Sequence, residues 1–259
     1  MGGGLVDLTG KRILVTGASS GIGRACAIRA VELGASVVAV GRREAALEET
    51  RQLALASVPE SEGRFVGQVC DLAVEGAAAE LIAKTAADGK FDGVVHAAGA
   101  GPTMPIGMVD RKFATDMMTV NYFVFLEIMK AFTRTKWRNP VFSAVAVSSI
   151  SAAAGWPGIS AYSGSKGALS ACVRALAMEL ASRGMRVNAV CPANIQTPML
   201  DLVLGDLGDE EVRAAIKQRQ PLGIGEPRQV ADPVCFLLSD AASFMTGANI
   251  PVDGGYLAQ

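Results

Sequence analysis

Short, nearly continuous apolar runs alternate with longer amphipathic segments along most of the chain. The runs predict seven strands, at Arg12–Val15, Ser36–Val40, Arg64–Val69, Gly93–His96, Val141–Val147, Arg186–Val190 and Asn249–Val252. The longer segments predict helices at Ile22–Leu33, Arg43–Ser57, Val74–Ala87, Arg111–Thr133, Tyr162–Ala181 and Val230–Leu238. Because the runs show little polar alternation, we expect strands buried on both faces of a parallel sheet. The alternation predicts a doubly wound α/β fold of about seven strands with helices on both faces.

One segment interrupts this alternation. Residues 193–227 carry several prolines and glycines around a short helical stretch, Asp209–Gln218. Inserted after the sixth strand, the segment would lie as a substrate lid over the carboxyl ends of the strands. Its apolar face would come from Met199, Leu200, Leu202, Val203 and Leu204. The alternative is a surface excursion that packs this face on the core. No linker or repeat divides the chain, so we expect one domain over residues 1–259.

Composition narrows the class of protein. Half of the 259 residues are hydrophobic and 19% are charged, which supports a large core and argues against disorder. The net charge of −1 and the lack of basic runs argue against a nucleic-acid partner. No apolar run approaches a membrane span, and the first residues lack the apolar core of a signal peptide. We therefore expect a soluble, cytoplasmic protein with no membrane partner.

Cysteine and histidine usage argues against a metal site. The five cysteines are far apart, with no Cys-x-x-Cys pair, so buried free thiols are expected. The chain has one histidine, His96, which leaves little material for a zinc site.

A glycine-rich turn follows the first strand, with the sequence TGASSGIG at residues 16–23, and a helix follows the turn. Glycines permit a tight turn and a close approach of backbone to a pyrophosphate, and the helix N-terminus supplies amide donors. The alternative is a tight turn of structural value only. The strand–turn–helix setting favours nucleotide binding.

Three further stretches are consistent with a nucleotide. Asp71 follows the third strand, where its carboxylate can accept a hydrogen bond from an adenine amino group. Small residues after His96 leave room for a flat ring, and Asn121 lies in a helix expected beneath the site. Each feature also has a purely structural explanation. Asp71 would be a cap, the small residues would allow close packing, and Asn121 would be a buried amide bonded to the backbone.

Tyr162 and Lys166 lie four residues apart on a predicted helix, so the two side chains share one face. A nearby cation favours the phenolate, which would let the tyrosine exchange a proton near neutral pH. The alternative is a tyrosine that anchors the helix and a lysine on its solvated side.

Taken together and in order, the motifs resemble those of a short-chain dehydrogenase/reductase of the single-domain type. The motifs are TGASSGIG at 16–23, CDL at 70–72, HAAG at 96–99, VNYF at 120–123, VSSIS at 147–151, YSGSK at 162–166, NAVCP at 188–192 and PVDGGY at 251–256. The resemblance implies a Rossmann-type sheet, a nicotinamide cofactor and hydride transfer to or from a carbonyl. Two departures are HAAG in place of Asn-Asn-Ala-Gly and Ala193 in place of the glycine after Pro192.

The resemblance also implies roles for four side chains. Ser149 would polarise the substrate carbonyl and Tyr162 would act as general acid or base. Lys166 would lower the pKa of Tyr162 and bind the ribose hydroxyls, and Asn121 would hold a water next to Lys166. Expected cofactor contacts are Gly17, Ser19, Ser20, Gly21, Ile22, Gly23, Arg42, Arg43, Asp71, Leu72, Ala97, Gly99, Tyr162, Lys166, Pro192, Ile195 and Thr197.

The end of the second strand indicates which nicotinamide is used. Gly41 is followed by Arg42 and Arg43, where an NAD enzyme normally has a carboxylate for the ribose 2′-hydroxyl. Guanidinium groups match a 2′-phosphate, so NADP(H) is predicted. The alternative places both arginines on the first turn of the next helix with no ligand.

For the substrate, the resemblance favours a small carbonyl or alcohol compound, free or bound to a carrier protein as in 3-oxoacyl-carrier-protein reductases. A basic cluster, Lys130, Arg134, Lys136 and Arg138, would attract an acidic carrier, or would simply be solvated near a helix C-terminus. The alternatives are an NAD(H)-dependent alcohol, sugar or steroid dehydrogenase and a non-catalytic nucleotide sensor. A homotetramer is implied, built on Arg111–Thr133, Tyr162–Ala181 and the C-terminal PVDGGYLAQ.

Overall fold

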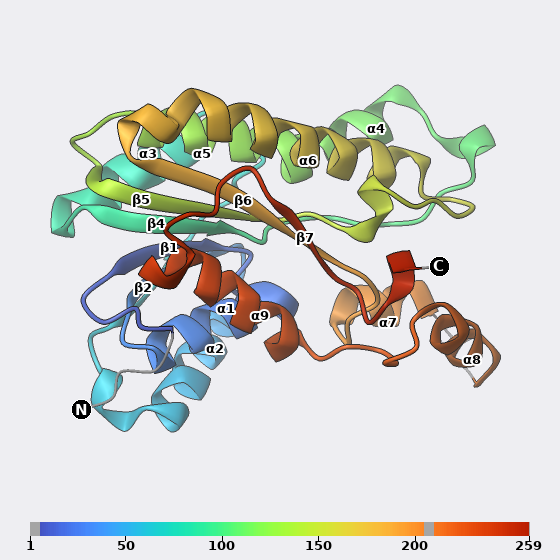
Figure 1. The fold of residues 1–259 in the computed structure, drawn as a ribbon, viewed down its shortest axis with the longest axis horizontal. Helices are drawn as coiled ribbons and strands as arrows, with labels where there is room; N and C mark the ends of the chain where they lie inside the picture. The colour runs from blue at the N-terminus through green and yellow to red at the C-terminus, as the bar shows by residue number, and fades with distance from the viewer. Residues whose placement is uncertain (1–5, 205–209, 259) are drawn as a thin grey trace.

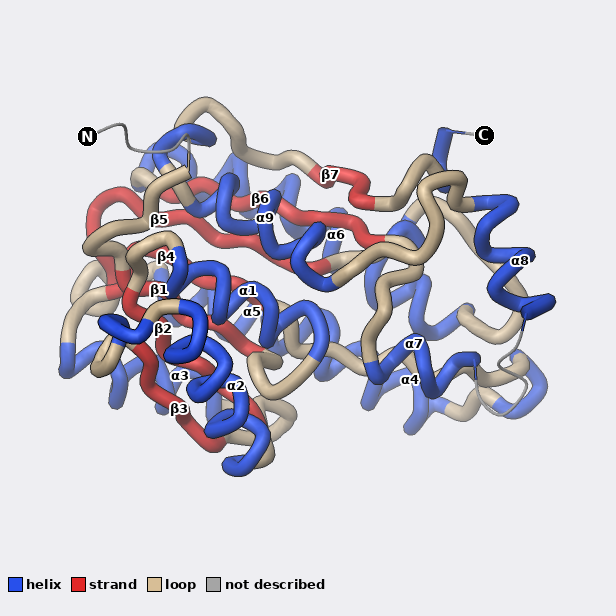
Figure 2. The backbone as a smooth tube through the Cα atoms, turned by 90° about the horizontal axis from the view of Figure 1, so that it is seen from below, coloured by secondary structure: helices blue, strands red, loops and turns tan. Residues whose placement is uncertain are grey.

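Seven parallel strands form one continuous sheet in the computed structural model, which describes residues 6–204 and 210–258. The strand order is β3-β2-β1-β4-β5-β6-β7, with the chain reversing direction across the sheet between β3 and β4. Figure 2 shows the strands side by side behind α1, α2 and α9. The strands are β1 (Arg12–Thr16), β2 (Ser36–Gly41), β3 (Phe65–Val69), β4 (Phe91–His96), β5 (Arg138–Val147), β6 (Met185–Pro192) and β7 (Asn249–Val252). The predicted fold class is confirmed.

Helices cover both faces of the sheet (Figure 1). One layer contains α1 (Gly21–Glu32), α2 (Glu44–Ser57) and α9 (Pro227–Leu238), and the opposite layer contains α3 (Ala77–Thr85), α4 (Arg111–Met118), α5 (Val124–Phe132) and α6 (Ser160–Leu180). The helix expected from Val74 begins three residues later, because Gly76 adopts a left-handed conformation (φ 83°) as its N-cap. The other boundaries lie within three residues of the prediction.

The predicted long helix Arg111–Thr133 is divided into three parts. Between α4 and α5 the backbone forms a π-helical turn, Thr119–Phe123, which contains Asn121. A π turn inserts extra backbone without interrupting the apolar face, so the sequence pattern reads as one helix. The turn sets the direction of the Asn121 side chain.

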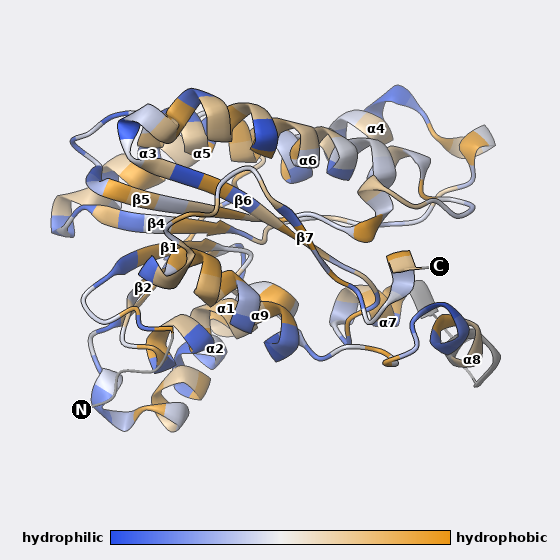
Figure 3. Ribbon diagram, in the orientation of Figure 1, coloured by the Kyte–Doolittle hydropathy of each residue, from blue (hydrophilic) through white to orange (hydrophobic). Residues whose placement is uncertain are grey.

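Apolar side chains fill the space on both sides of the sheet, as the orange strands of Figure 3 indicate. The core towards α3, α5 and α6 includes Phe91, Phe125, Phe132 and Phe142, all fully buried. The core towards α1 and α9 includes Cys26 and Cys235. Cys191 is also buried, but Cys70 and Cys172 are only half-buried, so the expectation of five buried thiols is wrong for these two.

β5 begins three residues before the predicted strand. Arg138, at its start, pairs with Phe91 of β4, and the register of the two strands shifts before Gly93. The Arg138 side chain is 3% exposed, and its guanidinium donates to the carbonyls of Phe132 and Arg183. A buried arginine with satisfied donors therefore extends a strand whose apolar run begins only at Val141.

The segment after β6 contains two helices where the sequence predicted one. α7 (Pro198–Leu204) was not predicted, and α8 (Glu210–Arg219) matches the predicted stretch apart from Asp209, which lies outside the described residues. The expected apolar face is only partly formed, since Leu200 is buried but Leu202 is 85% exposed. The side chains of Val203 and Leu204 lie outside the described part of the structure.

Candidate active site

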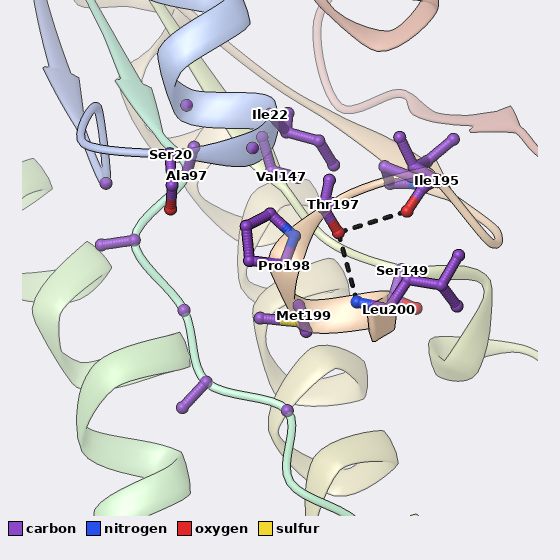
Figure 4. A pocket seen from close by; sticks show the side chains of 18 of the residues that line it. Ser20, Ile22, Ala97, Val147, Ser149, Ile195, Thr197, Pro198, Met199 and Leu200 are labelled. Carbon is purple, nitrogen blue, oxygen red and sulfur yellow. Dashed lines mark hydrogen bonds between the residues drawn. The ribbon is translucent and has the colours of Figure 1, made fainter. Parts of the chain in front are cut away.

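A cavity of about 1060 Å³ opens at the carboxyl ends of the strands. Its walls come from the segments that follow β1 to β6 and from α6, α7 and α8. Every cofactor contact expected from the sequence lines this cavity, and so do Ser149, Tyr162 and Lys166. Figure 4 shows Ser20, Ala97, Thr197 and Ser149, from four segments distant in the sequence, around the cavity. Asn121 lies outside the lining.

The glycine turn holds backbone against backbone. Gly17 has φ +68°, and a Cβ there would lie 2.7 Å from the Ala98 nitrogen. A Cβ at Gly23 would overlap the carbonyl of Gly17. Ser20 is the N-cap of α1 without a side-chain capping bond, and the first intrahelical bond runs from Arg24 to the Ser20 carbonyl, 3.1 Å. The preceding amides of the first turn are therefore left for an anion in the cavity.

Two arginines stand at the end of β2. Arg42 follows Gly41 and Arg43 is the N-cap of α2; both side chains are exposed and both line the cavity. Within the described residues neither takes part in an ion pair, whereas Arg24 pairs with Glu49 at 2.7 Å. The arrangement places two guanidinium groups beside the glycine turn.

The neighbouring strands supply smaller contacts. Asp71, after β3, accepts a hydrogen bond of 3.0 Å from the Ala73 nitrogen and lines the cavity with Leu72. After β4, a Cβ at Gly99 would lie 3.0 Å from Asn121 Oδ1 and 3.5 Å from Lys166 Nζ. Gly99 therefore leaves open the space between these two polar atoms.

Asn121 fastens the loop that follows β4. Its Oδ1 accepts from the Ala100 nitrogen, and its Nδ2 donates to the Ala100 carbonyl and to Ser165 Oγ, each at 2.9 Å. Both amide hydrogens are used, so only one lone pair of Oδ1 remains for a water. These bonds fix the loop 97–100, which the sequence did not indicate, and the role of Asn121 in holding a water stays a prediction.

Ser149 and Tyr162 meet at the substrate end of the site. Ser149 follows β5, and its Oγ accepts a hydrogen bond of 3.1 Å from the Ser151 nitrogen. Burial raises the pKa of Tyr162 above its usual value, and a hydrogen bond with Ser149 acts in the opposite direction. The phenol is therefore protonated at neutral pH.

Lys166 is buried on the next turn of α6. Its Nζ donates to the Val147 carbonyl at 2.8 Å and lies 5.8 Å from the centre of the Tyr162 ring. Burial lowers the pKa of Lys166 to about 8, with a smaller opposing effect of Cys191. The shift in the pKa of Tyr162 is attributed to burial and to Ser149, so the expected lowering of that pKa by Lys166 stays a prediction.

His96 contributes a buried contact that the sequence did not predict. Its Nδ1 lies 3.1 Å from Thr16 Oγ1, which also accepts from the Ala98 nitrogen at 3.1 Å. This contact between Thr16 and His96 joins the ends of β1 and β4. Burial, with the charge of Lys166, lowers the pKa of His96 to about 3, so the ring is neutral.

The segment after β6 lines the cavity, and its role as a substrate lid stays a prediction. Thr197 Cγ2 lies 3.2 Å from the position of a Cβ on Gly21. A Cβ on Gly101 would lie 3.0 Å from Met199 Sδ and 3.3 Å from Tyr162 Cε2. The segment thus extends from the glycine turn to the tyrosine, and Thr197 starts α7 by accepting from the Leu200 nitrogen at 3.4 Å (Figure 4).

Ala193 follows Pro192 at the end of β6 and lines the cavity. No described residue other than glycine has a positive φ, so alanine fits the backbone here without strain. The alanine therefore leaves the backbone path unchanged, and a narrowing of the cavity by its Cβ stays a prediction.

The basic cluster expected to attract a carrier is smaller than predicted. Arg138 is buried and its donors are occupied by backbone carbonyls, so it is unavailable. Arg134 Cζ and Lys136 Nζ both lie over the Trp137 ring, at 4.9 and 5.0 Å from its centre.

Neither a metal cluster nor a membrane span is found in the described ranges 6–204 and 210–258. No group of three His, Cys, Asp or Glu residues is placed to hold a metal ion. No helix there combines the length and the apolar character needed to cross a bilayer.

A doubly wound sheet with a glycine turn and a serine, tyrosine and lysine in one cavity defines a dinucleotide-dependent oxidoreductase. A family model described as enoyl-(acyl carrier protein) reductase matches residues 17–257. The 3-oxoacyl-(acyl-carrier-protein) reductase of Rickettsia felis is 36% identical, with 98% of this chain and 99% of the relative covered. The chain belongs to the short-chain dehydrogenase/reductase family and is an oxidoreductase.

Two other similar proteins show the range of the family. The L-rhamnose 1-dehydrogenase (NAD(P)+) of a Sphingomonas species is 35% identical, with 96% of each chain covered. A structure from Beutenbergia cavernae, provisionally assigned as an NAD(P)-dependent gluconate 5-dehydrogenase, contains NADP at low occupancy. It is 32% identical with a TM-score of 0.88, and 98% of this chain and 99% of that chain are covered.

Proposed function

We propose that this protein uses NADP(H) to reduce a ketone to a secondary alcohol. The observation that carries the proposal is the meeting of Ser149, Tyr162 and Lys166 in the same cavity as the glycine turn and the two arginines. The site fits a nicotinamide dinucleotide, because the open amides of α1 suit a pyrophosphate and Gly99 and Gly101 leave room for a ring. When bound, such a cofactor supplies the hydride.

Each side chain of the site has a separate role in the reaction. The Ser149 hydroxyl donates a hydrogen bond to the substrate carbonyl oxygen and favours the negative charge that develops there. Tyr162, protonated at neutral pH, gives its proton to that oxygen as the general acid. Lys166 binds the ribose hydroxyls and stabilises the phenolate left behind, while Asn121 and Thr16 keep the loop 97–100 in place. In the oxidative direction Tyr162 accepts the proton.

At the other end of the cavity, Arg42 and Arg43 bind the 2′-phosphate of NADP(H) and Asp71 accepts from the adenine amino group. Two observations support this choice of cofactor. The side chains of Arg42 and Arg43 are exposed and line the cavity, and neither position carries an acidic residue that would repel a phosphate. Arg42 makes the main contact and Arg43 assists.

A 3-oxoacyl thioester is the substrate class that we propose first, since reductases of that class are among the most similar curated relatives. The L-rhamnose and glucose 1-dehydrogenases favour a second candidate, a sugar or related polyol.

A homotetramer through α4, α5 and α6 is part of the proposal, supported by the 82% exposure of Met178 on α6.

A substrate panel tests this function. Acyl thioesters, sugars, steroids and small aromatic ketones are offered with NADPH and with NADH, and nicotinamide absorbance is followed. We expect turnover with NADPH, highest for a 3-oxoacyl thioester. Binding of both cofactors without turnover of any ketone or alcohol would contradict the reaction.

A further inference from the structure

The substrate end of the cavity, at Ser149 and Tyr162, has two aromatic side chains in its wall that the proposed reaction does not use. Trp156 lies in the loop between β5 and α6, and Tyr256 lies in the C-terminal turn after β7; both line the cavity. The centres of the two rings are 6.3 Å apart and their planes are inclined at 54°. Because Trp156 is 36% exposed, part of the indole remains uncovered beside the cavity.

Tyr256 is positioned from two sides. Asp253 caps the turn that carries it, since its carboxylate accepts from the nitrogens of Gly255 and Leu257 at 3.0 and 2.9 Å. Arg219, at the end of α8, donates from Nη1 to Tyr256 Oη at 3.2 Å. These bonds hold the turn and the hydroxyl group, so the tyrosine keeps its place without the contact to Trp156.

The loop that carries Trp156 is held by its backbone. Before the tryptophan, the nitrogens of Ala153 and Ala154 both donate to the Ile150 carbonyl at 2.8 Å. After it, the Gly158 carbonyl accepts from the Met104 nitrogen at 2.7 Å. The structural alternative is that Trp156 only ties this loop to the C-terminal turn. Since both segments are fixed by other bonds, that alternative leaves the position of the indole in the cavity wall without a reason.

Much of the remaining wall at this end is apolar. Ile150 and Ile159 line the cavity and are themselves buried, and Met199 lies beside Tyr162 across Gly101. A polar group of the wall is already engaged, since Asn194 Nδ2 donates to Gln220 Oε1 at 3.2 Å. Burial of apolar surface against such a wall is favourable, whereas hydroxyl groups would lose hydrogen bonds to water that the wall replaces poorly.

We infer that Trp156 and Tyr256 determine specificity by packing against an apolar substituent of the substrate, a ring or an acyl chain, while the ketone of the same molecule lies at Tyr162. The inference rests on the proposed reduction of a ketone and adds the chemical class of the group next to it. It favours a ketone with an apolar substituent over a sugar. Aromatic side chains suit a flat ring best, because tilted and offset ring pairs are favourable beyond the area that they bury.

Two matched pairs of ketones test the inference in the whole protein with NADPH. 4-Phenyl-2-butanone and 2-butanone differ in an aromatic ring, and the N-acetylcysteamine thioesters of 3-oxooctanoate and 3-oxobutanoate differ in the length of an apolar chain. We expect kcat/KM for the larger member of one pair or both to fall by about tenfold or more in Trp156→Ala, as for a lost apolar contact, and the smaller members to change by less than about threefold. A response of the phenyl ketone alone assigns a ring, and a response of the longer thioester alone assigns an acyl chain.

Three further variants separate the ring contact from other roles. Trp156→Phe and Tyr256→Phe keep an aromatic ring and should retain most of the preference for the larger member, although Tyr256→Phe loses the bond from Arg219. Phe244→Ala removes a fully exposed ring outside the cavity lining and should match the wild type. Equal effects of Trp156→Ala on the larger and smaller members of both pairs, or no effect on any, would overturn the inference.

A binding measurement keeps the inference distinct from the proposed function. If none of the four compounds is reduced, the reaction is wrong for them, and 4-phenyl-2-butanone is titrated into the protein saturated with NADP+ while tryptophan fluorescence is followed. The chain has two tryptophans, and Trp137 is buried outside the cavity lining. A saturable change in the wild type that is absent in Trp156→Phe would support the apolar subsite. A change that persists in Trp156→Phe, or no change in the wild type, would overturn it.

Discussion

Lys166 Nζ donates a hydrogen bond of 2.8 Å to the Val147 carbonyl, so the ammonium of α6 is held by the last residue of β5. The bond directs the lysine into the space beside Gly99 instead of along the tyrosine side chain. The cost of this position is desolvation, which lowers the pKa of Lys166 to about 8.

The lowered pKa predicts a pH dependence of stability. Between about pH 8 and the usual value of 10.5 the unfolded chain binds more protons at this lysine than the folded one. The free energy of unfolding should therefore gain up to about 3 kcal/mol from this group as pH rises through that window, and the full penalty remains below pH 8. Urea unfolding of the wild type and of Lys166→Met across pH 7 to 10.5 measures this change in the free energy of unfolding. A difference between the two proteins that stays constant with pH would contradict burial of the charge.

Tyr162→Phe should remove the acid and keep the packing of the ring. We expect kcat to fall by about 100-fold or more, the size of effect typical of a positioned proton donor, with little change in the Kd of NADPH. Stopped-flow turnover and fluorescence titration measure the two quantities. Tyr122→Phe is the matched control, because Tyr122 packs on Phe123 and is not among the lining residues. Near-normal turnover of Tyr162→Phe would assign the acid to another group.

Asn121→Ala should destabilise the protein. The substitution leaves the Ala100 nitrogen and carbonyl without their partner and removes one of the two bonds of Ser165 Oγ, and each buried group left unpaired costs about 1–3 kcal/mol. We also expect a higher Kd for NADPH, because the loop 97–100 lines the cavity. Asn139→Ala loses one bond to Asp92, and both residues lie near the starts of β5 and β4, at the other end of the strands from the cavity. This variant should leave that Kd unchanged. If Asn121→Ala kept full stability and lost only kcat, a role in holding water would be the better explanation.

Gly23→Ala tests the close backbone contact of the glycine turn. Gly23 lies in the first turn of α1 without a positive φ, so helix propensity alone would favour alanine by about 1 kcal/mol. Overlap of the new methyl group with the Gly17 carbonyl should reverse the sign and destabilise by about 1–3 kcal/mol. Thermal unfolding measures this, with Gly107→Ala as the control because a Cβ there meets nothing within 4 Å. Equal Tm changes in the two variants would show that the turn can relax.

The strands were predictable because each apolar run is short and bounded by polar residues or glycine, and their parallel order follows from the alternation with helices. The π turn around Asn121 and the helix Pro198–Leu204 were not, because neither changes the period of the apolar pattern enough to be seen in one sequence.

The glycine turn and the pair Tyr162 and Lys166 were found from their local spacing, and Ser149 was found from the family resemblance. His96 with Thr16 and Arg219 with Tyr256 were missed, since these partners are 80 and 37 residues apart and meet only in the folded chain. The C-terminal motif PVDGGY was assigned to the resemblance and to an oligomer contact, and did not indicate that Tyr256 would line the cavity.

The cofactor preference depends on Arg42. Its guanidinium is exposed at the end of β2, lines the cavity and lies next to the N-terminus of α2, where the helix dipole disfavours a cation. A 2′-phosphate would compensate that placement.

We expect the wild type to favour NADPH over NADH in kcat/KM, and Arg42→Asp to reverse the preference, because the carboxylate repels the phosphate and accepts a bond from the 2′-hydroxyl. Arg43→Asp should weaken the preference without reversing it, and Arg51→Asp, on the same helix but not among the lining residues, should leave the ratio unchanged. Steady-state rates with both cofactors and one substrate decide the matter, and a wild-type enzyme that favours NADH would refute the assignment of both arginines.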